Sequence, residues 1–92
     1  MNLEFAVIDW LDAVHHSGVS GTAEDLAELG PVRVQSSGFV VCEDEQSITL
    51  AVDYFFEHKT FREPSVYPKS MILRVDRYEY DLPVDPKKSE AV

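Results

Sequence analysis

The clearest pattern in the chain is a period of two. Apolar residues alternate with polar or small ones through residues 47–56, which predicts a β-strand with one buried face. Residues 32–42 are also rich in β-forming side chains, and Gly38 within them indicates a bend or a bulge. A polar turn at 43–46 separates the two segments. We therefore predict a β-hairpin whose first strand is bent.

The N-terminal part contains one predicted strand and one predicted helix. Residues 3–13 are rich in β-formers and predict a strand, with a short helix as the alternative because Asp9 and Asp12 break the alternation. Residues 22–29 predict a short helix that begins after Thr22 as its N-cap. Two turns are not stable alone, so we expect the two leucines of this helix to pack on the sheet.

The C-terminal part predicts two more strands. Residues 57–64 indicate a charged loop, residues 65–67 a short strand, and residues 71–82 a strand with alternating apolar positions that Pro83 ends. With its prolines and charges, the segment 83–92 is typical of a frayed tail.

Together these elements predict a mainly β fold: a small, strongly bent antiparallel barrel of four or five strands with one short helix. A sheet this small must hide its apolar face and its edges, and closure into a barrel does both. The bend at Gly38 supplies the curvature. A curled open sheet with the helix on top is the alternative. We expect residues 1–82 to form one domain.

Composition limits the class of protein. The chain has 92 residues, of which 45% are hydrophobic, and ten are aromatic, more than is typical of disordered chains. It lacks an apolar run of the roughly 20 residues that a membrane helix requires. The N-terminal residues do not resemble a secretory signal. Cys42 is the single cysteine, cannot form an internal disulfide and is interpreted as a small core residue. We expect a cytoplasmic protein.

Charge is distributed unevenly. The net charge is −9, which disfavours general binding to nucleic acid or membranes. Residues 59–77 nevertheless contain five basic and two acidic side chains, a local charge of +3 against −12 elsewhere. This stretch has three interpretations: an anion-binding strip, the basic half of a head-to-tail contact with an identical chain, or a chance cluster on a solvated surface.

Catalytic and metal-binding patterns are not evident. The adjacent His15 and His16 lack the spacing of a zinc site, and the serines lack the nucleophile-elbow motif. We therefore predict no catalytic residue, no metal and no cofactor. The acidic run that begins at Glu43 is expected to be solvated because it lies in a hairpin turn.

Two carboxylates stand within apolar strands. Asp9 and Asp53 need partners if they are buried, and either Arg33 or Arg74 could supply one. We prefer this structural role to acid–base catalysis.

Short motifs carry a resemblance to known proteins. Residues 38–44 (GFVVCED), 48–51 (ITLA) and 68–72 (PKSMI) resemble a group of small uncharacterised bacterial, phage and metagenomic proteins. More distantly the chain is similar to the Sm-like barrels, which are related in shape to the Src-homology-3 type. That resemblance matches Gly38 to the bend glycine and Asp44 to the turn aspartate. It implies a barrel, assembly into rings and frequent RNA binding. The expected asparagine after the aspartate and the arginine–glycine pair before the last strand are absent.

We therefore expect a non-enzymatic, self-associating Sm-like interaction module, most simply a homo-oligomer. Arg74 and Arg77 are the candidate interface residues. The alternative is a protein of phage or mobile-element origin that binds RNA or single-stranded nucleic acid. For a ligand or an anion, the candidate binding residues are Lys59, Arg62, Tyr67, Lys69 and Ser70.

Overall fold

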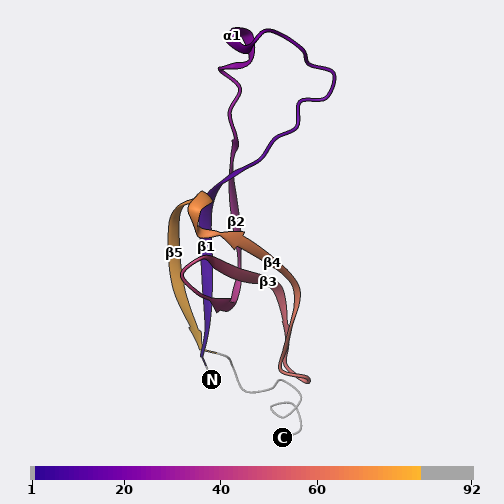
Figure 1. Ribbon diagram of the computed structural model, residues 1–92. Helices are drawn as coiled ribbons and strands as arrows, with labels where there is room; N and C mark the ends of the chain where they lie inside the picture. Colours follow the sequence, from indigo (N-terminus) through magenta and orange to yellow (C-terminus); the bar gives the residue numbers. More distant parts are fainter. Residues whose placement is uncertain (1, 82–92) are drawn as a thin grey trace, which may run out of the picture.

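The computed structural model describes residues 2–81 of the chain, and within them it is mainly β. Five antiparallel strands form one sheet in the order β4-β3-β2-β1-β5. This confirms the predicted class and the antiparallel arrangement (Figure 1). The elements are β1 (Asn2–Asp12), α1 (Ala23–Leu26), β2 (Val32–Glu43), β3 (Ser47–Phe55), β4 (Thr60–Pro68), the 3-10 turn η1 (Lys69–Met71) and β5 (Ile72–Asp81). The predicted tail at 83–92 lies outside the described residues.

The predicted hairpin of β2 and β3 is confirmed, and so is the strand at the N-terminus. β1 lies in the interior of the sheet between β2 and β5, which excludes the helical alternative. In the β2–β3 turn, a carboxylate oxygen of Asp44 accepts hydrogen bonds from the backbone N–H groups of Gln46 and Ser47, both at 2.8 Å. An aspartate that bonds the backbone two residues on is a common way to fix such a turn.

β2 connects the two halves of the sheet, β1 with β5 on one side and β3 with β4 on the other. It pairs with β1 along its first part and with β3 along its last part, and Phe39 has a partner on each side. Gly38 lies at this change of partner, where an added Cβ would stand 2.6 Å from the backbone oxygen of Ala51. A strand can come this close only where it has no side chain, so Gly38 lets the two halves of the sheet approach each other.

The core lies on one face of the curled sheet. A cluster of four fully or almost fully buried side chains comes from β1 and β3: Ala6, Ile8, Ile48 and Leu50. Partly buried hydrophobic residues from β1, β2, β4 and β5 pack against it: Trp10, Val40, Tyr67, Ile72 and Val75. Because β1 and β3 are separated by β2 in the sheet, their contact shows that the sheet curls around this cluster.

Residues 13–31, here called the arm, extend away from the sheet on the β1–β2 ribbon (Figure 1). The predicted N-cap is confirmed: the Thr22 hydroxyl accepts from the Asp25 N–H, and the Asp25 carboxylate accepts from the Thr22 N–H. The expected packing of the helix on the sheet is wrong. α1 has one turn without a buried residue, and Leu29 is 46% exposed. The capping box stabilises α1 instead, and the β1–β2 ribbon carries it.

Two further predictions are corrected. β4 begins at Thr60, so the loop predicted through residue 64 is wrong over its second half. Pro64 is compatible with this strand because β4 ends the sheet, and an edge strand does not need every N–H for pairing. Cys42 is exposed and does not belong to the core, because it follows the register irregularity of β2 near its end.

Strand pairing within residues 2–81 leaves β4 and β5 at the two ends of the sheet. No helix in this part of the chain is long and apolar enough to span a membrane.

Candidate functional site

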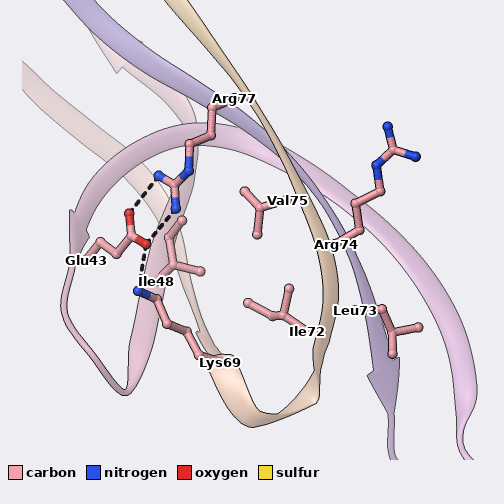
Figure 2. Close-up of a pocket in the computed structure, with 8 residues that line it drawn as sticks. All are labelled: Glu43, Ile48, Lys69, Ile72, Leu73, Arg74, Val75 and Arg77. Atoms are coloured by element: carbon pink, nitrogen blue, oxygen red, sulfur yellow. Dashed lines mark hydrogen bonds and ion pairs between the residues drawn. The ribbon is translucent and has the colours of Figure 1, made fainter.

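A groove of about 330 Å³ lies along β5, near the end of β2 and the turn η1. It brings residues of η1 and β5 together with Glu43 at the end of β2 and Ile48 near the start of β3 (Figure 2). The lining residues are Glu43, Ile48, Lys69, Ile72, Leu73, Arg74, Val75 and Arg77.

An ion-pair network forms one wall of the groove. The Glu43 carboxylate accepts hydrogen bonds from both terminal nitrogens of Arg77, at 2.8 and 2.7 Å, and the Lys69 ammonium lies 2.7 Å from the same carboxylate. Arg77 Nη1 also donates to Glu4 Oε1 at 2.6 Å. Paired hydrogen bonds between guanidinium and carboxylate fix orientation as well as charge. The network therefore ties the end of β2 to η1, β5 and β1.

This network controls the protonation of Glu43. The hydrogen bonds from Arg77, followed by that from Lys69, lower the pKa of Glu43 from its ordinary value of 4.5 to about 2. The pKa of Arg77 is raised, chiefly because Glu43 and then Glu4 accept its hydrogen bonds. A general acid or base works best with a pKa near the operating pH. At neutral pH, Glu43 is thus a fixed charge suited to a structural role.

The remainder of the groove is apolar and borders a free strand edge. Ile48 forms part of the floor and is fully buried, and Ile72 and Val75 pack against the same core. Figure 2 shows Arg74 and Leu73 projecting from β5 away from the ion-pair network. Leu73 lies at a register irregularity of the β1–β5 ladder and is 55% exposed. The groove thus combines an unpaired edge, apolar side chains and basic groups.

The predicted basic stretch 59–77 is divided among separate places. Lys69 and Arg77 meet at Glu43, whereas Arg74 forms an exposed pair with Asp76 at 3.0 Å. These three cations line one groove, so the structure brings together this part of the predicted set.

Arg62 and Lys59 belong to the β3–β4 hairpin instead. Arg62 donates to Asp53 at 2.6 Å, and its guanidinium carbon lies 4.7 Å from the centre of the Phe55 ring. Lys59 occupies the turn before β4, with a backbone φ of 52°. Neither residue lines the groove at β5.

Tyr67 and Ser70 complete the predicted ligand set. The Tyr67 ring meets Trp10 edge to face, with 5.1 Å between ring centres, and it packs against the core cluster. Ser70 lies in η1 and is exposed. A ligand-binding role of these two residues stays a prediction.

Two expectations about carboxylates have clear outcomes. Asp9 accepts hydrogen bonds from Arg33 at 3.0 Å and Gln35 at 3.1 Å, which confirms the pairing predicted for it. These bonds, that from Arg33 first, lower the pKa of Asp9. Asp53 is also paired, but its partner is Arg62 and not Arg33 or Arg74.

Glu43 is exposed as a residue, as expected for a turn acid, but its carboxylate is paired. Its side chain is only 22% exposed, because Arg77 and Lys69 cover it. Sequence reasoning missed this residue and Glu4, since their shared partner Arg77 is distant along the chain from both. The sequence offers no local signal for such a contact.

The described residues 2–81 contain no group of three or more His, Cys, Asp or Glu side chains placed to hold a metal ion. No protein-family model matches the chain, and no curated protein and no solved structure matches it significantly. The function must therefore be argued from the groove, the strand edges and the arm.

Proposed function

We propose that this protein is a non-enzymatic interaction module that self-associates and is built as a small Sm-like barrel. The observation that carries the proposal is the position of β4 and β5, which end the sheet without a further strand partner among residues 2–81. Unpaired strand edges present free N–H and C=O groups that pair readily with another chain. Most soluble oligomers consist of identical chains.

Several features support a barrel. Gly38 permits close approach of β2 and β3, and Ile48 of β3 packs with Ile8 of β1 on the same inner face. Lys69 at the start of η1 reaches Glu43 at the end of β2. These contacts curl the sheet around the core cluster, as closure into a barrel of five strands would require.

The structure sharpens the expectation for the interface cations. Arg77 is engaged by Glu4 and Glu43, so its charge is already neutralised within the chain. Arg74 is the better interface residue, because its side chain is 69% exposed and its pair with Asp76 is a surface pair. Such pairs contribute about 0–1 kcal/mol and exchange partners at little cost.

The test is the molar mass of the full chain by light scattering after size exclusion, over a range of concentrations. We expect a discrete species larger than the 10.4 kDa chain. A single 10.4 kDa species at every concentration up to the solubility limit would overturn the proposal.

A second candidate, binding of single-stranded nucleic acid, is favoured by one observation. Phe55 and Phe56 are 41% and 39% exposed at the β3–β4 hairpin, beside Lys59 and Arg62. Bases stack on exposed aromatic rings near cations. The pair between Arg62 and Asp53 removes one of these charges.

Fluorescence anisotropy of a labelled single-stranded RNA at low salt tests this candidate. Binding that Phe55→Ala weakens and Phe5→Ala does not would support it, because Phe5 lies in β1, outside this hairpin. Absence of binding would reject it.

A further inference from the structure

We infer that the groove beside β5 binds the arm of a second copy of this chain. The inference rests on the proposed self-association and names the two surfaces that meet. Each copy has one arm and one groove, and the contact is therefore head-to-tail.

The arm has the chemistry of a docking element. Its apolar side chains are exposed, with Val14 at 40%, Val19 at 55% and Leu29 at 46%. Its charged side chains are all acidic: Glu24, Asp25 and Glu28, without any lysine or arginine between residues 13 and 31. An exposed apolar segment with one sign of charge fits a surface that is apolar and oppositely charged.

The groove has the complementary chemistry. Its lining contains Ile72, Val75 and the exposed Leu73 together with three basic side chains, of which Lys69 and Arg77 are already engaged by acids of the same chain. Arg74 is the most exposed of the three cations, and within residues 2–81 its one ion pair is with Asp76. An incoming carboxylate can therefore pair with Arg74 while the network around Glu43 stays intact.

The geometry makes this contact intermolecular. Figure 1 places α1 at the far end of the arm, beyond the β1–β2 ribbon and away from η1. The groove lies beside η1, whose Lys69 lines it. The ladder from Phe5↔Phe39 to Asp12↔Val32 holds the ribbon in register up to the base of the arm and directs the arm away from the sheet. A second copy can bring its arm to the groove without any rearrangement of either chain.

Two variants test the arm and the groove separately. The arm variant carries Glu24→Lys and Glu28→Lys, and the groove variant carries Leu73→Asp and Arg74→Glu. All four side chains are exposed, so circular dichroism should show both variants folded. We expect each variant alone to associate at least tenfold more weakly than the wild type, a loss of about 1.4 kcal/mol.

Mixing the two variants is the decisive measurement. Each groove-variant chain keeps a normal arm, and each arm-variant chain keeps a normal groove. An equimolar mixture should therefore form a heterodimer of about twice 10.4 kDa at a concentration at which each variant alone stays largely monomeric. A single Glu28→Lys variant is compared with Glu45→Lys in the β2–β3 turn, which alters the charge equally and lies outside the arm, so that an effect of the arm is separated from one of net charge.

The outcomes distinguish this inference from the proposed function. A wild-type oligomer that the arm variant forms equally well would overturn the arm contact and leave self-association standing through the strand edges. Loss of association in both variants without recovery on mixing would also overturn the head-to-tail contact. A wild type that is monomeric throughout would overturn the proposed function itself.

Discussion

Gly38 is the residue on which the curvature of the sheet depends. A Cβ at this position would lie 2.6 Å from the backbone oxygen of Ala51, and backbone cannot move aside as a flexible side chain can. We expect Gly38→Ala to lower the free energy of unfolding by about 1–3 kcal/mol, the usual cost of overpacking. Urea denaturation followed by circular dichroism measures it.

Gly30→Ala is the matched control for this change. An added Cβ at Gly30 meets nothing within 4 Å, so its free energy of unfolding should stay within about 0.5 kcal/mol of the wild type. Equal effects of the two substitutions would contradict the role given to Gly38.

The lowered pKa of Glu43 makes the free energy of unfolding depend on pH. Its pKa is about 2 in the folded chain and 4.5 ordinarily, so the unfolded chain binds more protons between these values. The stabilisation from Glu43 is therefore complete above pH 4.5 and is lost as the pH falls toward 2. We expect Glu43→Gln to be less stable than the wild type at neutral pH and to lose less stability across this window.

Chemical denaturation at a series of pH values measures both effects. Glu45→Gln removes a carboxylate from the adjoining turn that forms no ion pair among residues 2–81. The free energy of unfolding of Glu45→Gln should depend on pH as that of the wild type does. If the free energy of unfolding of Glu43→Gln ran parallel to that of the wild type across this pH range, Glu43 would not be the source of the pH dependence.

At the residue scale, the sequence predicts contacts that follow from local rules. Asp9 lies in an apolar strand, and a carboxylate there needs a donor. This predicted a pair with Arg33 or Arg74, and Arg33 is the partner. The network of Glu43 could not be predicted in this way. Arg77 is 34 residues from Glu43 and 73 from Glu4, and only the curl of the sheet brings them together.

At the element scale, β3 and β4 show what a pattern can and cannot predict. The alternation in β3 reflects one buried face, and its bounds were predicted almost to the residue. β4 was predicted only in part because Glu63 and Pro64 disfavour strands by propensity. An edge position removes that penalty, and the position of a strand in the sheet is not visible in its own sequence.

The arm offers a prediction about stability. Replacing residues 13–31 by Asn-Gly joins β1 to β2 through a short hairpin turn. Shortening the loop about tenfold lowers the entropy cost of its closure, which should raise the free energy of unfolding by up to about 2 kcal/mol. Urea denaturation measures this, and a marked destabilisation would show that the arm supports the sheet.

For the whole molecule, the head-to-tail contact predicts a dependence on salt. The Debye length falls from about 10 Å at 0.1 M ionic strength to about 3 Å at 1 M, and this screens exposed pairs such as those of Arg74. We expect the molar mass from light scattering to fall toward that of one chain in high salt, while circular dichroism stays unchanged. An assembly that high salt strengthens would indicate an apolar contact.

For the molecule as a whole, the sequence predicted the fold class correctly and the shape less well. Strand number and antiparallel order follow from the hydrophobic pattern and the hairpin turn. The extended arm could not be predicted, because Leu26 and Leu29 have the spacing of a helix that packs on a sheet. Whether such a helix reaches the sheet depends on how far the β1–β2 ribbon continues, and residues within the helix contain no information on that length.

The position of β1 has a consequence for dividing the chain in two. β1 supplies Leu3, Ala6 and Ile8, three of the six buried apolar residues of the described part, and the arm alone joins it to everything that follows. A peptide that ends within the arm and a fragment that begins there should each be unfolded, yet reconstitute the sheet when mixed. If the two fragments were fused to two other proteins, reconstitution of the sheet would indicate that those proteins bind each other.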